Sequence, residues 1–336
     1  MGKGEGMNQR SFPLSRTPRE YLGLWLRGFC MGCADVVPGV SGGTMAFILG
    51  IYEELIESIR VLGSPEFLKA VAGFRIGEVL RLFRWKFLGS VLAGIFVAVL
   101  SLAKGLEWLL ENQAVYLWSF FFGLVLASIY SVSKRKTHWT RGTLGAVLAG
   151  TVVAYVVVGM VPLQTPENYA FLFFSGALAI CAMILPGISG SFVLVLLGKY
   201  EYVLAAVNNR DLATLAVVAA GCVVGLITFA QFLGWLFRRY HDMTIAVLIG
   251  LMVGSLRKIW PWKETVEFMR DRHGELQPMI EKNVLPESWN GEVGLALALA
   301  AVGFVVVLVL DRLANQPNPD AGCPKAVGEY PEPKDR

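Results

Sequence analysis

The chain has 336 residues, of which 55% are hydrophobic and only 17% are charged. This composition is typical of proteins that face lipid, and it argues against a soluble enzyme. The formal net charge is +4, from 30 basic and 26 acidic residues. Because the basic residues form short clusters between apolar runs, the sequence also argues against a nucleic-acid partner.

The cysteines and histidines give no sign of a metal or redox centre. Cys30 and Cys33 have the spacing of a redox pair, but there is no second pair and no nearby histidine. The three histidines are scattered singly near charged turns. We therefore expect no cofactor and no metal.

Six uncharged runs are candidates for membrane spans, since a bilayer core about 30 Å thick needs roughly 20 apolar helical residues. In chain order they are residues 87–103, 112–133, 142–166, 212–237, 243–256 and 293–310. The run 243–256, with 14 residues, is the weakest candidate. The basic, amphipathic segment 65–86 is expected to be a helix that lies on the membrane surface.

Two further apolar regions are interrupted in the middle. The first is broken at Pro38 and Gly39, and the second at Pro186 and Gly187. Proline lacks a backbone donor and glycine permits non-helical backbone, so neither helix continues through its break. We expect re-entrant hairpins at residues 22–58 and 169–204, each entering and leaving the membrane on one side.

The two hairpins belong to an internal repeat. Shifting residues 28–53 by 148 positions places them on residues 176–201 with 11 of 26 positions identical. Each hairpin is followed by three spans, and an odd number of spans puts the hairpins on opposite faces of the membrane. The expected fold is an all-α polytopic membrane protein with two inverted repeats, each of one re-entrant helical hairpin and three transmembrane helices.

The repeats also define the domain boundaries. The first is expected over residues 21–163 and the second over 164–311, with an outer loop at 258–292. The tail 1–20 precedes them, and the tail 312–336 is rich in proline and charge, as disordered segments are. Lysines and arginines cluster in the connector 58–86 and in two later turns, so the positive-inside rule places both termini in the cytoplasm.

The second arm of each hairpin begins with small polar residues. They are Ser41, Gly42, Gly43 and Thr44 in the first half, and Ser189, Gly190 and Ser191 in the second. Amides at a helix N-terminus lack intrahelical partners and carry partial positive charge, which favours phosphate or carboxylate groups. If the two tips meet near the membrane midplane, we expect one anion site there.

Helix termini alone cannot offset the burial of an ionised group, so the site needs further charge. Arg27 is the candidate cation, and Asp35 is the candidate acid for binding a proton or sodium ion. The alternatives are an interfacial position for Arg27 and a structural capping role for Asp35. Glu53 and Glu201, which recur in both halves, are either gates that pair with basic residues or solvated helix ends. Lys199 is expected to snorkel to the membrane surface.

The doubled Pro-Gly-x-Ser-Gly motif resembles the bacterial polyprenyl-phosphate transporter family PopT, and the likeness covers about residues 21–310. The resemblance implies a multi-pass protein of the bacterial inner membrane that returns undecaprenyl phosphate from the outer to the cytoplasmic leaflet for cell-envelope synthesis. Its partners would be this or a related polyprenyl phosphate, the surrounding membrane lipids, and a proton or sodium ion for coupling. The sequence does not indicate an oligomeric state.

Two other functions remain open at this point. An ion-coupled transporter of a small soluble anion would use the same inverted hairpins. A lipid-modifying membrane enzyme would need a base or a metal beside Ser41 or Ser189, and no intramembrane histidine or lysine is placed to activate either serine. We therefore expect a transporter rather than an enzyme.

Overall fold

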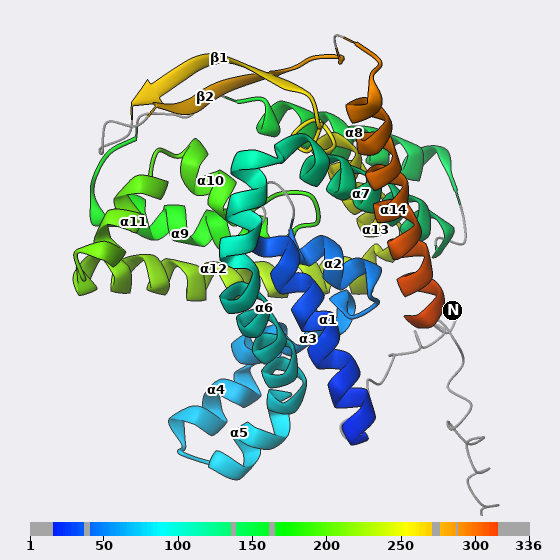
Figure 1. Cartoon of the computed structure of the whole chain (residues 1–336). Coiled ribbons are helices and arrows are strands. Elements are labelled where there is room, and N and C mark those ends of the chain that lie inside the picture. The colour runs from blue at the N-terminus through cyan, green and yellow to red at the C-terminus, as the bar shows by residue number, and fades with distance from the viewer. Residues whose placement is uncertain are drawn as a thin grey trace, which may run out of the picture.

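The computed structural model describes residues 16–36, 41–135, 139–160, 165–270, 276–286 and 288–314. Within these residues the protein is helical apart from one two-stranded antiparallel β-hairpin (Figure 1). The expected all-α polytopic membrane fold is confirmed, because five helices are long and apolar enough to cross a bilayer.

The first half contains a hairpin, a pair of short helices and three long helices. In chain order these are α1 (Pro18–Val36), α2 (Gly42–Ile48), α3 (Tyr52–Arg60), the 3-10 helix η1 (Val61–Gly63), α4 (Pro65–Ala72), α5 (Ile76–Leu82), α6 (Trp85–Asn112), α7 (Ala114–Arg135) and α8 (Arg141–Val158). Pro38 and Gly39 lie outside the described residues. The break that they predict falls between the end of α1 and the start of α2.

The second half repeats this order without the pair of short helices. It consists of α9 (Tyr169–Ile184), α10 (Gly190–Leu196), α11 (Tyr200–Asn208), α12 (Leu212–Arg239), α13 (His241–Ser255), β1 (Lys263–Arg270), β2 (Leu276–Asn283) and α14 (Gly291–Ala314). The equivalent helices match in length: α2 and α10 have 7 residues, α3 and α11 have 9, and α6 and α12 have 28. The inversion of one half across a membrane stays a prediction.

The second arm of each hairpin is shorter than a continuous helix would be. The helix α2 ends at Ile48 and α3 starts afresh at Tyr52, while α10 and α11 are bent by 107°. Seven helical residues span only about 10 Å, roughly a third of the hydrocarbon core. If the hairpins are re-entrant, the interruption of each helix therefore lies well inside the apolar layer.

The long helices pack in pairs that join the two halves. The helices α1 and α9 lie along α6 and α12 of their own halves, whereas α7 packs along α14 and α8 along α13 of the opposite half. The backbones of α7 and α14 touch: a Cβ on Gly123 would lie 1.9 Å from the carbonyl oxygen of Ala300. The five candidate spans are α6, α7, α8, α12 and α14, and α7 is 61% buried against 17–28% for the others. Among these five helices α7 is therefore the most central, and the others present apolar faces to lipid.

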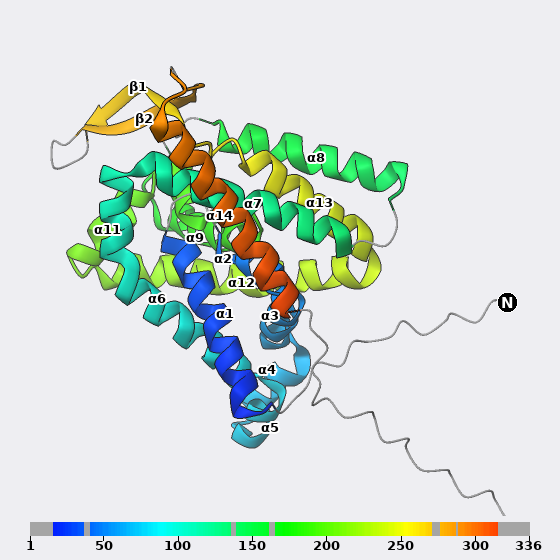
Figure 2. The same ribbon diagram turned by 45° about the vertical axis from the view of Figure 1, so that its right-hand side comes forward.

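The α4–α5 pair projects from one end of the molecule, opposite the β-hairpin (Figures 1 and 2). The segment expected as one surface helix is two, because the chain turns at Phe74, whose φ is 52°. Phe74 and Ile76 are 89% and 70% exposed, as expected of side chains that contact lipid at the membrane surface.

The expected outer loop contains the two strands β1 and β2. Lys263 anchors this β-hairpin to the bundle: its ammonium lies 4.4 Å from the ring centre of Trp118 on α7 and 3.3 Å from the Glu281 carboxylate. Burial against the bundle lowers the pKa of Lys263 to about 8, because loss of hydration disfavours the charged form more than Glu281 favours it.

Candidate functional site

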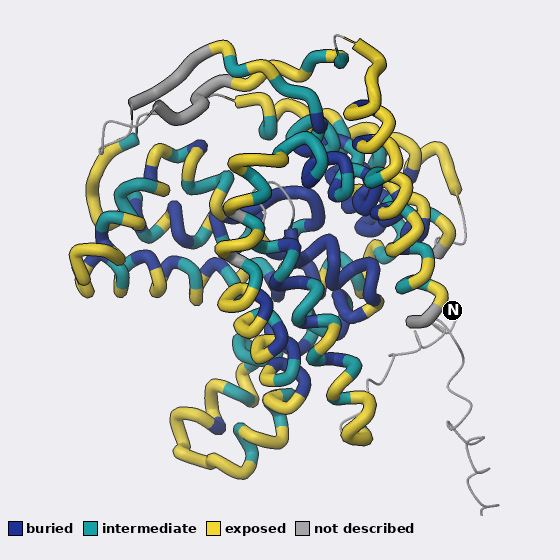
Figure 3. The backbone as a smooth tube through the Cα atoms, in the orientation of Figure 1, coloured by how far each residue is buried: buried dark blue, intermediate teal, exposed yellow. Residues whose placement is uncertain are grey.

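The tips of the two hairpins meet inside the protein. The Ser41 hydroxyl lies 3.1 Å from the carbonyl oxygen of Met183 and 3.3 Å from that of Leu185. In return, the backbone N–H of Gly187 donates to the Thr44 hydroxyl at 3.0 Å. Ser41 and Thr44 are each 1% exposed, and α2 is buried at the centre of the molecule (Figure 3). The convergence on which the expected anion site depends is therefore present.

A carboxylate occupies the N-terminus of α2. The amide of Gly42 donates to Asp35 Oδ1 at 2.6 Å, and that of Gly43 donates to the Ser41 hydroxyl at 3.1 Å. A Cβ on Gly42 would lie 2.4 Å from Asp35 Oδ2, so a larger residue at this position would force the carboxylate to move. The arrangement is that of an anion bound at a helix N-terminus. In this conformation the anion is the protein's own Asp35, which agrees with the capping role considered for this residue.

The tip of the second hairpin is less completely satisfied. Ser189, which precedes α10, makes no side-chain cap to the backbone; its hydroxyl instead lies 2.7 Å from that of Ser191. Gly190 is buried against α9 and Ser191 is exposed. The exposed hydroxyl residue at the junction, Ser191, therefore comes from the second half, whereas the charged side chain, Asp35, comes from the first.

The remaining predicted residues lie away from the junction. Arg27 precedes Asp35 by eight residues on α1, about 12 Å along the helix axis, and interacts electrostatically with Arg16 and Glu54. The Glu53 carboxylate accepts a hydrogen bond from His241 Nε2 at 3.2 Å, which joins α3 to α13. The contact between Glu53 and His241 thus connects the first hairpin to α13 near its open end.

The two charged residues of the second hairpin, Lys199 and Glu201, differ in burial and in polar partners. Glu201 is half-buried, and the described parts of the chain provide no ion pair for it. Lys199 does not snorkel: its side chain is 1% exposed and its ammonium donates to the carbonyl oxygen of Thr165 at 2.9 Å. This hydrogen bond joins the segment before α9 to the turn between α10 and α11.

Sequence reasoning missed a buried ionic cluster around Glu54. Both carboxylate oxygens of Glu54 accept from Arg16, at 2.8 and 2.7 Å, and one also lies 3.2 Å from Arg84. These partners are 38 and 30 residues away in the chain. Nothing local distinguishes Glu54 from the neighbouring Glu53, so only the fold reveals which carboxylate is buried.

Comparison with known proteins places this arrangement in a family. The chain is 43% identical over 302 residues to the polyprenyl-phosphate transporter of Vibrio cholerae serotype O1, which covers 88% of this chain and 98% of the relative. It is 32% identical over 310 residues to the polyprenyl-phosphate transporter of Staphylococcus aureus, covering 87% and 96%. No solved structure matches significantly. Both relatives are named as transporters and not as enzymes. Residues 31–277 match the model of the undecaprenyl phosphate translocase-like family, and the chain belongs to this family.

Proposed function

We propose that this protein carries a polyprenyl phosphate across the bacterial inner membrane and returns undecaprenyl phosphate from the outer to the cytoplasmic leaflet. The names of its relatives and its five candidate spans support this function. Such a lipid combines an ionised phosphate with a long apolar chain. Only the phosphate is costly to bring into hydrocarbon, so only the phosphate needs a path through the protein while the chain stays in lipid.

The observation that carries the proposal is the hydrogen-bonded junction of the two hairpins, where the Gly42 amide holds an anionic oxygen 2.6 Å away. A phosphate oxygen has the charge and the size to replace the Asp35 carboxylate on this amide. The hydroxyls of Ser189 and Ser191 lie at the start of α10 in the other hairpin and can supply further donors.

Asp35 and a phosphate cannot occupy this position together as anions, because like charges a few ångströms apart in a poorly hydrated site repel strongly. Asp35 must therefore swing away or take up a cation as the phosphate arrives. A proton or a sodium ion on the carboxylate would remove the repulsion and balance part of the buried phosphate charge. We infer that lipid movement is coupled to such an ion through Asp35.

The positive-inside rule places the α4–α5 end and both chain termini in the cytoplasm. Arg27 lies closer than Asp35 to the N-terminus of α1, which points toward that end (Figure 1), so we assign to it a role along the path to the cytoplasmic leaflet instead of a contact at the junction. The β-hairpin would then face the outer side, at the opposite end of the molecule (Figure 1).

Reconstitution tests the proposal. Liposomes containing the full chain and a fluorescent polyprenyl phosphate report leaflet exchange as loss of fluorescence when a membrane-impermeant quencher is added outside. We expect exchange with wild-type protein, accelerated by a proton or sodium gradient. Asp35→Asn retains an oxygen that can accept from Gly42, so the variant should fold but lose the response to the gradient. Wild-type liposomes without exchange, but with uptake of a soluble anion, would support the other kind of transporter.

A further inference from the structure

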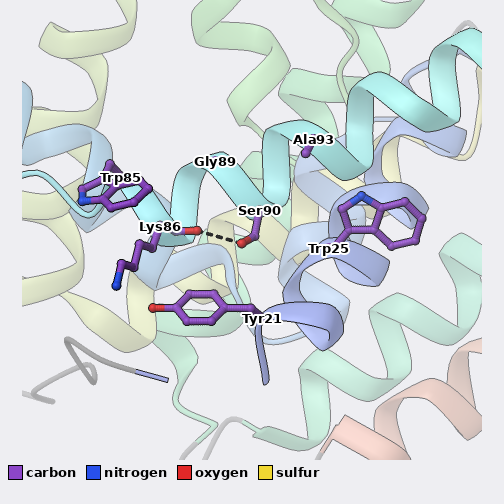
Figure 4. A pocket seen from close by; sticks show the side chains of 7 residues that line it. All are labelled: Tyr21, Trp25, Trp85, Lys86, Gly89, Ser90 and Ala93. Atoms are coloured by element: carbon purple, nitrogen blue, oxygen red, sulfur yellow. Dashed lines mark hydrogen bonds between the residues drawn. The ribbon is translucent and has the colours of Figure 1, made fainter. Parts of the chain in front are cut away.

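Two adjoining cavities lie where the start of α6 meets the start of α1. The larger, about 540 Å³, is an open groove with Gly89 and Ala93 along one side and Trp25 on the other (Figure 4). The smaller, about 240 Å³, extends from α1 toward α3 and α5. Tyr21, Trp85 and Lys86 line both, so the two cavities share one wall.

The smaller cavity is strongly basic. Its lining carries four cations and a single carboxylate, Glu54, so the cavity is rich in positive charge. Two of the cations, Arg16 and Arg84, are fixed by Glu54. The other two, Arg81 and Lys86, have no acidic partner among the described residues, and the ammonium of Lys86 lies 5.5 Å from the ring centre of Trp85. Two exposed cations are thus available beside two that are already held in place.

The groove, in contrast, is apolar and runs along a helix that can cross the membrane. The candidate span of α6 begins at Trp85, and Ala93 is eight residues further on, about 12 Å along the axis. Tryptophan and tyrosine prefer the boundary between headgroups and hydrocarbon, so the aromatic end of the groove marks that boundary. The basic cavity is then at the depth of lipid headgroups, and the groove lies beside lipid chains.

We propose that this pair of cavities is a docking station for a polyprenyl phosphate at the membrane surface, with the phosphate on Arg81 and Lys86 and the first isoprene units in the groove beside Gly89. The station rests on the proposed function and adds to it a second binding place, separate from the hairpin junction. A phosphate monoester carries nearly two negative charges at neutral pH, whereas the phosphodiester of a phospholipid carries one. The excess of positive charge and the single groove therefore favour the monoester of one chain over a two-chain phospholipid.

The groove offers a substitution that fills it without disturbing the protein. A Cβ on Gly89 meets no atom within 4 Å, so Gly89→Leu should fold normally while its side chain occupies the space of an isoprene unit. Gly105, near the other end of the same helix, is equally open, and Gly105→Leu is the matched control. For the cations, the double variant Arg81→Gln/Lys86→Gln is compared with Lys104→Gln, also on α6 and exposed.

The experiment uses the full chain in nanodiscs of zwitterionic phosphatidylcholine with a photoreactive polyprenyl phosphate, and the readout is crosslinking to the peptides of residues 21–25 and 85–93. We expect the groove variant to lower this crosslinking about tenfold, and the double variant, which removes two cations, to lower it by at least as much, since tenfold corresponds to the loss of one charge-assisted hydrogen bond. Both controls should match the wild type. Excess phosphatidylglycerol or inorganic phosphate should compete weakly.

Unchanged crosslinking in Gly89→Leu, or equal competition by phosphatidylglycerol, would overturn the docking station. The two proposals fail separately. A junction variant such as Gly43→Ala should lose leaflet exchange but keep crosslinking at residues 85–93, which would support the station. If wild-type protein showed crosslinking there without any leaflet exchange, the proposed function would fall and the docking station would stand as a lipid-phosphate site.

Discussion

Replacing Gly43 by alanine tests whether the contact between the hairpins holds the site together. A Cβ at this position would lie 2.5 Å from the carbonyl oxygen of Ile184, so the tips must separate by about 1 Å to restore an ordinary van der Waals distance. That shift would lengthen the hydrogen bonds from Ser41, now 3.1 and 3.3 Å, beyond useful range.

The expected cost follows from three contributions. Overpacking costs about 1–3 kcal/mol, the weakened hydrogen bonds add up to about 1 kcal/mol each, and the better helix propensity of alanine returns about 0.5–1 kcal/mol. We expect a net loss of about 2 kcal/mol in the free energy of unfolding. Leaflet exchange should fall with it, because the phosphate position is built from both tips.

The assay is reversible unfolding in mixed micelles together with leaflet exchange in liposomes. Gly23→Ala in α1 is the control, since a Cβ there meets nothing within 4 Å, and it should be neutral or stabilise by up to about 1 kcal/mol. If Gly43→Ala were as stable and as active as Gly23→Ala, the junction would be neither tight nor necessary, and the reasoning from the hairpin contact would be refuted.

Three further outcomes are expected. Thr44→Val should destabilise by about 1–3 kcal/mol, because the buried Gly187 amide loses its acceptor, whereas Thr44→Ser should restore stability; equal stability of the two variants in the same unfolding assay would contradict this. Glu54→Gln should cost about 3 kcal/mol by leaving two arginines without their carboxylate, against less than about 1 kcal/mol for the more exposed Glu57→Gln. Lys263 binds its proton more weakly in the folded state, with a pKa of about 8 against about 10.4 when unfolded. Between these two pKa values the unfolded state binds more protons than the folded state. The free energy of unfolding should therefore rise with pH from about 8 to 10, by up to roughly 3 kcal/mol. Lys263→Met removes this contribution, so parallel pH profiles for wild type and variant would show that the lysine is not buried as described.

The sequence predicts the hairpins because their breaks have a local cause. Proline and glycine stop a helix wherever they occur, and the second break is seen between the end of α9 at Ile184 and Ser189. The short arms were less predictable. Gly50 and Gly198 end α2 and α10 at positive φ, but a single glycine in an apolar run is also compatible with a continuing membrane helix.

Contacts between distant segments could not be derived in the same way. The bond from Ser41 to Met183 joins residues 142 positions apart, and the repeat indicates only that equivalent residues exist in both halves. The burial of Lys199 has the same origin: its partner, the carbonyl of Thr165, is a backbone group that no side-chain pattern identifies. The strands β1 and β2 were missed because their mixed charges are also typical of an exposed loop.

The packing of helices from one half against helices from the other limits how this protein can move. Since α7 packs along α14 and α8 along α13, a hinge motion between the halves would have to separate two long helix pairs, both with main chains in close contact, at Gly123 and at Gly250. The seven-residue helices α2 and α10 have much shorter interfaces with their neighbours than these long helices, so they can reorient at smaller cost even though α2 is fully buried. We expect the long helices to stay rigid through the transport cycle. Movement of the short helices α2 and α10 would then open the site to one leaflet and the other in turn.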